Sequence, residues 1–191
     1  KKLIDFISHY KCEQLNITWY GGEPLLAFDR ILSINRAILS MGKKYTASMI
    51  TNGYLFDDEK IGRLNELQIG YLQITLDGTK KTHDERRCLK GGRPTYDIIL
   101  ENIGKILKSE FKGRIHIRVN VDSRNEDELK KFKEYLQNKL YFIEFEWLII
   151  GEIVSTPNNY QVIKNIFNLL ENKYCTLKVN DIFNNEDSTG L

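Results

Sequence analysis

The sequence contains few of the residues that build small folds held together by disulfides or metal ions. It has only three cysteines, Cys12, Cys88 and Cys175, which are far apart, and it has no CxxC or HxxxH pair. This spacing argues against a disulfide framework and against a local zinc site. We therefore expect a reducing, cytoplasmic location, with each cysteine acting as a small buried or half-buried apolar side chain.

The sequence also lacks a long apolar run and an excess of charge of one sign. Its 28 Lys and Arg residues nearly balance its 26 Asp and Glu residues, which gives a net charge of +2. Such a balance indicates neither a nucleic acid nor an anionic membrane as partner. No P-loop, GxGxxG motif or Ser-His-Asp signature is present.

Short apolar runs rich in β-forming residues alternate with longer amphipathic stretches. This pattern predicts a parallel sheet with crossover helices, either an open doubly wound sheet or part of a (β/α) barrel. Both architectures place functional groups in the loops that follow the strands. Strands are expected at residues 15–20, 46–50, 71–76, 115–121, 142–150 and 175–179, and helices at 3–10, 28–39, 57–66, 96–107, 126–136 and 157–170.

The first of these loops has the sequence Gly21-Gly22-Glu23-Pro24. Glycine lets a ligand approach the backbone closely, and a proline forces the residue before it into an extended conformation. The carbonyls of Gly21 and Gly22 and the Glu23 carboxylate would then form a set of acceptors, which suits an ammonium group. The alternative is a tight turn with a solvated Glu23.

Three further segments come after strands. Residues 51–53 (Thr-Asn-Gly) and 76–78 (Leu-Asp-Gly) are also favoured turn sequences, so each by itself is explained as a turn. Residues 83–87 (His-Asp-Glu-Arg-Arg) fit either a solvated charged loop or an arginine that binds a ligand carboxylate through its planar fork.

Taken together and in this order, these motifs resemble the radical S-adenosylmethionine (SAM) superfamily. The resemblance rests on ITWYGGEPLL at 17–26, ITNG at 50–53, QITLDG at 73–78 and HDERR at 83–87, and covers about residues 3–152. Within the superfamily, the motifs resemble most specifically the branch that contains anaerobic sulfatase-maturating enzymes and ribosomal-peptide maturases with a C-terminal SPASM domain. The resemblance implies an α/β fold, a partial parallel (β/α) TIM-like barrel of about five strands with the first strand missing.

In that family a CxxxCxxC motif holds a 4Fe–4S cluster, whose fourth iron binds SAM, and this motif is absent from the sequence. The resemblance implies that the motif and the first barrel strand precede Lys1, where the chain opens without Met, and that the SPASM cysteines follow Leu191. Residues 1–180 are then a truncated core domain and 181–191 a linker toward the SPASM domain. The fragment by itself is expected to be inactive.

The resemblance also implies residue roles. The backbone of Gly21 and Gly22 and the carboxylate of Glu23 would hold the methionine ammonium of SAM. Thr75, where Ser is commoner in the family, and Arg87 would bind its carboxylate.

Three further positions complete the expected site. Leu148 or Ile149 would pack on the adenine, and Asp77 would be a catalytic residue facing the substrate. Asn120 is a polar residue at the end of a strand whose role stays open. Tyr20 stands where some relatives carry Gln, so contacts near it cannot be copied from the family.

The activity that the resemblance implies is reductive cleavage of SAM. The resulting 5′-deoxyadenosyl radical would abstract a hydrogen atom from a peptide or protein, with ferredoxin or flavodoxin as electron donor. One alternative is a degenerate barrel that binds peptides without redox chemistry. Another is an aldolase or isomerase barrel, which requires a Schiff-base lysine or metal-binding carboxylates at strand ends. Here the strand ends offer Glu23 and Asp77 but no lysine.

Overall fold

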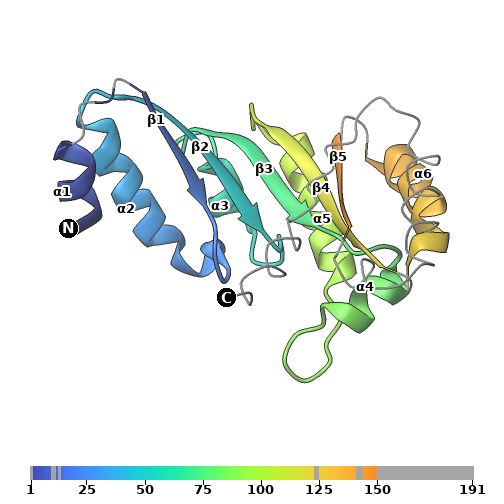
Figure 1. The fold of residues 1–191 in the computed structure, drawn as a ribbon. Helices are drawn as coiled ribbons and strands as arrows, with labels where there is room; N and C mark the ends of the chain where they lie inside the picture. The colour runs from blue at the N-terminus through green and yellow to red at the C-terminus, as the bar shows by residue number, and fades with distance from the viewer. Residues whose placement is uncertain (1, 10–11, 13, 123–124, 141–143, 150–191) are drawn as a thin grey trace, which may run out of the picture.

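A computed structural model of the chain describes residues 2–9, 12, 14–122, 125–140 and 144–149. Its centre is a single sheet in which every neighbouring pair of strands is parallel (Figure 1). The strand order follows the sequence without reversal, so each crossover moves one strand in the same direction. A doubly wound sheet reverses its order at a switch point, whereas a barrel does not. The partial parallel barrel is therefore confirmed, with strands β1 (Gln14–Trp19), β2 (Lys44–Thr51), β3 (Ile69–Thr75), β4 (Arg114–Val121) and β5 (Glu144–Ile149).

The helices match the expected pattern with two exceptions. The helix expected at 57–66 is shorter, since α3 ends at Gly62. Residues 80–86, expected to be part of a loop, form the helix α4. The expected helix at 157–170, the strand at 175–179 and the linker at 181–191 lie outside the described residues. The helical elements are α1 (Lys2–His9), η1 (Pro24–Ala27), α2 (Phe28–Leu39), α3 (Asp58–Gly62), α4 (Lys80–Arg86), α5 (Tyr96–Lys108), η2 (Glu126–Glu128) and α6 (Leu129–Lys139).

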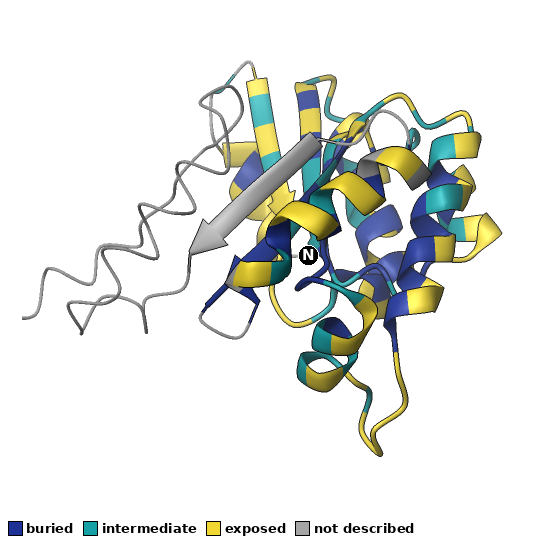
Figure 2. Cartoon of the chain, turned by 90° about the vertical axis from the view of Figure 1, so that its right-hand side faces the viewer, coloured by how far each residue is buried: buried dark blue, intermediate teal, exposed yellow. Residues whose placement is uncertain are grey.

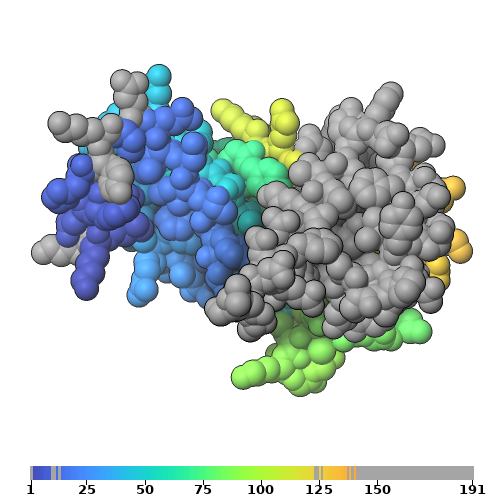
Figure 3. All heavy atoms as spheres, in the orientation of Figure 1, coloured from blue at the N-terminus to red at the C-terminus, as the bar shows by residue number. Residues whose placement is uncertain are grey.

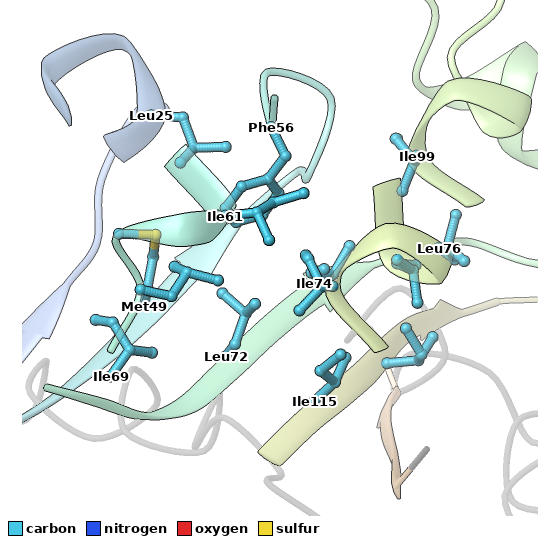
Figure 4. Close-up of a cluster of buried hydrophobic side chains, with 14 of the residues drawn as sticks. Leu25, Met49, Phe56, Ile61, Ile69, Leu72, Ile74, Leu76, Ile99 and Ile115 are labelled. Carbon is cyan, nitrogen blue, oxygen red and sulfur yellow. The ribbon is translucent and has the colours of Figure 1, made fainter. Parts of the chain in front are cut away.

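The core lies between one face of the sheet and the helices. Alternate residues of a strand point to opposite faces, and in β3 the buried Leu72 and Ile74 contribute to the core beside Ile99 of α5 (Figure 4). The helices are amphipathic, with buried and exposed residues alternating along them (Figure 2). The other face of β3 carries Gln73 and Thr75, so polar side chains line the inner face of the partial barrel.

Two helices donate N-terminal hydrogen bonds to the carboxylates of distant side chains. Glu128 accepts hydrogen bonds from the Thr79 backbone N–H (2.9 Å) and hydroxyl (2.7 Å) at the start of α4. Asp84 accepts from the N–H groups of Thr95 (2.8 Å) and Tyr96 (2.9 Å) at the start of α5. Although burial opposes ionisation, these backbone donors and Lys80 hold the pKa of Asp84 below its usual value.

A third helix has a local cap, which gives a direct stability prediction. The Asp57 carboxylate accepts the Lys60 N–H at 2.8 Å, as the N-cap of α3. Asp57→Ala should lower the free energy of unfolding by about 1 kcal/mol, measured by urea denaturation. Asp57→Asn, which keeps an acceptor, is the matched control, and an equal loss in both variants would assign the effect to charge instead of capping.

Among the described residues, no helix combines the length and apolarity needed to cross a membrane.

Candidate functional site

The ends of parallel strands gather at one edge of the sheet, where the loop after β1 is tied to the end of β2. One carboxylate oxygen of Glu23 accepts the Thr51 hydroxyl at 2.6 Å and the Leu25 N–H at 3.0 Å, and the other accepts the Asn52 N–H at 2.9 Å. Glu23 is extended (φ −131°, ψ 109°), as predicted from the following Pro24. The Glu23 side chain therefore joins the first two motifs physically and is not simply solvated.

Gly21 and Gly22 leave the backbone of this loop open. Both have positive φ, +102° and +53°, a region that other residues rarely adopt. A Cβ built on either residue would have no heavy atom within 4 Å. Both residues are also exposed, so a ligand can approach the backbone here, as the sequence predicts.

Beyond β3, the carboxylate of Asp77 is surrounded by donors from the protein. One oxygen accepts the backbone and side-chain N–H groups of Asn120, each at 2.8 Å, and the other accepts Nε of Arg87 at 2.5 Å. The side chain is only 4% exposed. Asp77 thus faces Asn120 and Arg87, and the expected contact with a substrate is not part of this geometry.

Arg87 keeps part of its guanidinium accessible. Its side chain is 37% exposed, and Asp77 engages only Nε. Within the part of the chain that the structure describes, neither Nη atom makes a hydrogen bond, and the same holds for the Thr75 hydroxyl. A planar fork at the end of β3, held from one side by a buried carboxylate, is suited to bidentate binding of a carboxylate.

Arg86 points differently from its neighbour. Its side chain is 11% exposed and forms an ion pair with Asp122, which is 8% exposed. It also donates from Nη1 to the Asn120 carbonyl at 3.0 Å. The adjacent arginines therefore have different roles. Arg86 connects α4 to the end of β4, whereas the Nη atoms of Arg87 remain available as donors.

Two asparagines complete the connection between the ends of β3 and β4. Asn125, which is 1% exposed, donates from Nδ2 to the carbonyls of Asn120 (2.9 Å) and Asp77 (3.3 Å), and its Oδ1 accepts the Asp122 N–H at 2.9 Å. Asn120, whose role was left open, is a partner of Asp77. The sequence pattern places these residues after a strand, but it gives no signal for their pairing.

His83 is completely buried behind Arg87. Its Nδ1 accepts the Asp77 N–H at 3.1 Å, and Nε2 lies 3.1 Å from the hydroxyl of Thr95. Burial lowers the pKa of His83 to about 4, although Asp77 acts in the opposite direction. The sequence gives no signal for this pairing, because Thr95 lies 12 residues further along the chain.

Two expected elements stay outside this geometry. Leu148 lies in β5 opposite Asn120 in the strand register, but its side chain is outside the described part of the structure.

Of the two cysteines that the structure describes, Cys12 is half-buried, and Cys88 is exposed, contrary to expectation. Cys88 lies in the loop between α4 and α5, which projects from the body of the molecule (Figures 1 and 3). Across the described residues, no cluster of three or more His, Cys, Asp or Glu is placed to hold a metal ion.

Comparisons with known proteins agree with these motifs. The sequence profile described as "Radical SAM superfamily" matches residues 1–136. A serine-type anaerobic sulfatase-maturating enzyme of Bacteroides thetaiotaomicron is 29% identical over 164 residues, 81% of this chain and 38% of the relative. The sporulation killing factor maturation protein SkfB of Bacillus subtilis strain 168 is 28% identical over 129 residues, 67% of this chain and 29% of the relative.

Solved structures support the same fold. Native anSMEcpe with bound AdoMet has a TM-score of 0.71 at 20% identity, over 92% of this chain and 52% of that protein. The structure of anSMEcpe with bound AdoMet and Kp18Cys peptide has a TM-score of 0.72 at 20% identity, over 92% and 53%. The chain thus spans about half the length of these structures and less than half of the curated relatives.

Proposed function

Because the chain belongs to the radical SAM superfamily, we propose that it forms the SAM-binding core of an enzyme that modifies a peptide or protein by radical chemistry. The observation that carries this proposal is the Arg87 guanidinium, which Asp77 holds at Nε while Asn120 in turn donates to Asp77. The proposal for the substrate is supported by two relatives named for maturation of a sulfatase and of a killing factor, and by the anSMEcpe structure with bound peptide.

The residues present fit a zwitterionic ligand. The methionine part of SAM carries an ammonium and a carboxylate, which need acceptors and donors respectively. The open backbone at Gly21 and Gly22, next to the Glu23 carboxylate, would bind the ammonium. The Nη atoms of Arg87 and the Thr75 hydroxyl would bind the carboxylate, with a charge-assisted contact at Arg87. Leu148 keeps its proposed place against the adenine.

Asp77 has a different role in this proposal from the one that the sequence indicates. Its two oxygens bond to Asn120 and Arg87 and are buried. Asp77 would therefore hold Arg87 by Nε and leave the opposite edge of the guanidinium for the ligand. We assign it as a positioning residue that does not touch the reacting atoms.

SAM and a 4Fe–4S cluster, when bound together, supply hydrogen-atom abstraction. The sequence contains no CxxxCxxC, and the described residues hold no comparable set of ligands. No step through the cluster is therefore assigned to this chain. An electron donor such as ferredoxin or flavodoxin belongs to the proposal for the whole enzyme.

The binding role of Arg87 can be tested in the full-length protein that contains this chain. Arg87→Ala should weaken SAM binding by on the order of 1.5–3 kcal/mol, the scale of a hydrogen bond to a charged group, or about 10- to 150-fold in Kd. Arg87→Lys should restore only part of the affinity, because an ammonium cannot reproduce the planar fork. Calorimetric titration with SAM under anaerobic conditions measures both.

Lys81→Ala is the matched control for this test, because Lys81 is an exposed cation on the same helix. It should leave the affinity unchanged. Equal losses at Lys81 and Arg87 would indicate a general electrostatic effect, and full affinity in Arg87→Ala would remove that residue from the site.

A further inference from the structure

We propose that His83 is a positioning residue for binding of the ligand carboxylate. Its neutral ring fixes the backbone of Arg87 and thereby keeps the Arg87 guanidinium directed at the ligand. This inference rests on the proposed function of Arg87. It concerns a residue that contacts no ligand and acts only through its neighbours.

The hydrogen bonds around His83 can run in only one direction. The Asp77 backbone N–H is a donor, so Nδ1 of His83 must accept, which places the proton of the neutral ring on Nε2. Nε2 then donates to the Thr95 hydroxyl, and that hydroxyl donates its own proton to the Arg87 carbonyl at 2.8 Å. The relay connects β3, α4 and the start of α5, and ends on the backbone of Arg87.

Arg87 is consequently held at three atoms. Its backbone N–H donates to the His83 carbonyl at 2.8 Å, and its own carbonyl accepts the Thr95 hydroxyl. Its side chain donates from Nε to Asp77. Two of these contacts depend on the position of His83, and the third depends on Asp77, whose N–H His83 accepts. His83 thus lies at the point where the backbone and side-chain restraints on Arg87 meet.

The surroundings of His83 exclude a direct part in the reaction. Its ring is completely buried, and both nitrogens are already bonded. The Tyr96 ring packs edge-on against it, with centroids 5.7 Å apart. The low pKa caused by burial keeps the ring neutral near pH 7, the state that this relay requires. Because the His83 ring has no accessible atom and no nitrogen free for proton transfer, its role is to position neighbouring residues.

The test compares two substitutions of His83. His83→Leu removes both ring contacts of the relay, to the Asp77 N–H and to the Thr95 hydroxyl. It should weaken SAM binding on the order of tenfold, the effect of one to two neutral hydrogen bonds. His83→Gln can place an amide donor near the position of Nε2 and should recover part of the affinity. Thr95→Val interrupts the same relay from the other side and should resemble His83→Leu. Calorimetry with SAM on the full-length protein is the readout.

A double-mutant cycle separates positioning from general destabilisation. In the Arg87→Ala background, His83→Leu and Thr95→Val should cause no further loss of SAM affinity, because their effect passes through Arg87. Equal losses in both backgrounds would overturn the inference. The core variant Ile38→Val, in the remote helix α2, lowers stability without touching the relay and should leave the affinity unchanged.

The cycle also distinguishes this inference from the proposed function. If the unmodified protein binds no SAM, the proposed function fails. If it binds SAM and Arg87→Ala loses affinity, but Thr95→Val and His83→Leu do not, only the positioning role fails. Where His83→Leu does not fold, Thr95→Val alone decides, since Thr95 keeps its backbone bond to Asp84.

Discussion

Replacing Arg86 with alanine is expected to lower the free energy of unfolding by about 3–5 kcal/mol, the cost of breaking a buried ion pair by removing one of its members. Arg86 and Asp122 are both nearly buried, and Arg86 also donates to the Asn120 carbonyl. Removing the guanidinium takes away a buried ion pair of the Asp122 carboxylate and one of the two donors to the Asn120 carbonyl, which keeps its hydrogen bond from Nδ2 of Asn125. Urea denaturation of the purified chain measures the loss.

The matched double variant tests the cause of this loss. Arg86→Met with Asp122→Leu removes both charges and should cost less than Arg86→Ala alone, because both members of the buried pair are replaced by apolar side chains. Arg87→Ala offers a second comparison. The Arg87 side chain is 37% exposed, so its loss should affect stability less than the loss of Arg86. A smaller effect at Arg86 than at Arg87 would contradict this assignment.

Acidification should lower the free energy of unfolding by on the order of 3 kcal/mol through His83 alone, between pH 6.5 and about pH 4. The pKa of His83 is depressed in the folded chain, so the unfolded state binds a proton in this range that the folded state does not. The contribution is complete above pH 6.5, falls as the pH falls and is absent below about pH 4. Asp77, Asp84, Arg87 and Lys80 are the charged groups around the ring.

Urea denaturation at a series of pH values measures this dependence. His83→Gln has no titrating ring and should flatten the curve between pH 4 and 6.5. The depressed pKa of Asp84 contributes only below its ordinary value of 3.8, outside this range. An unchanged slope in His83→Gln would assign the acid sensitivity to other groups.

Local patterns were sufficient to predict the sheet. Every described strand begins and ends within about two residues of its expected position, because apolar alternation and the turn residues that follow are local signals. The helix α4 was missed for a related reason. Its sequence is charged, without an apolar stripe, and the bonds at its start come from Glu128, 49 residues away.

The sequence was sufficient to predict which residues form the candidate site, but not which side chains bond to one another. The motifs selected Glu23, Thr75 and Arg87. In the structure Glu23 is the N-cap of η1, Thr75 is the last residue of β3, and Arg87 is the C-cap of α4. It could not be seen from the sequence that Arg86 is buried and Arg87 accessible, since the two are adjacent and chemically identical. The different surroundings arise from Asp122 and Asp77, which follow different strands.

The remote hydrogen bonds at the start of α4 have a consequence for the order of folding. A helix of seven residues is unstable in isolation, so α4 should form only after the segment around Glu128 has docked beside the end of β3. The amides of α4 and of η2 should therefore exchange with solvent as one cooperative unit. Any transient detachment of that segment would also release the helix that carries Arg87, so the arginine fork belongs to a late-forming part of the fold.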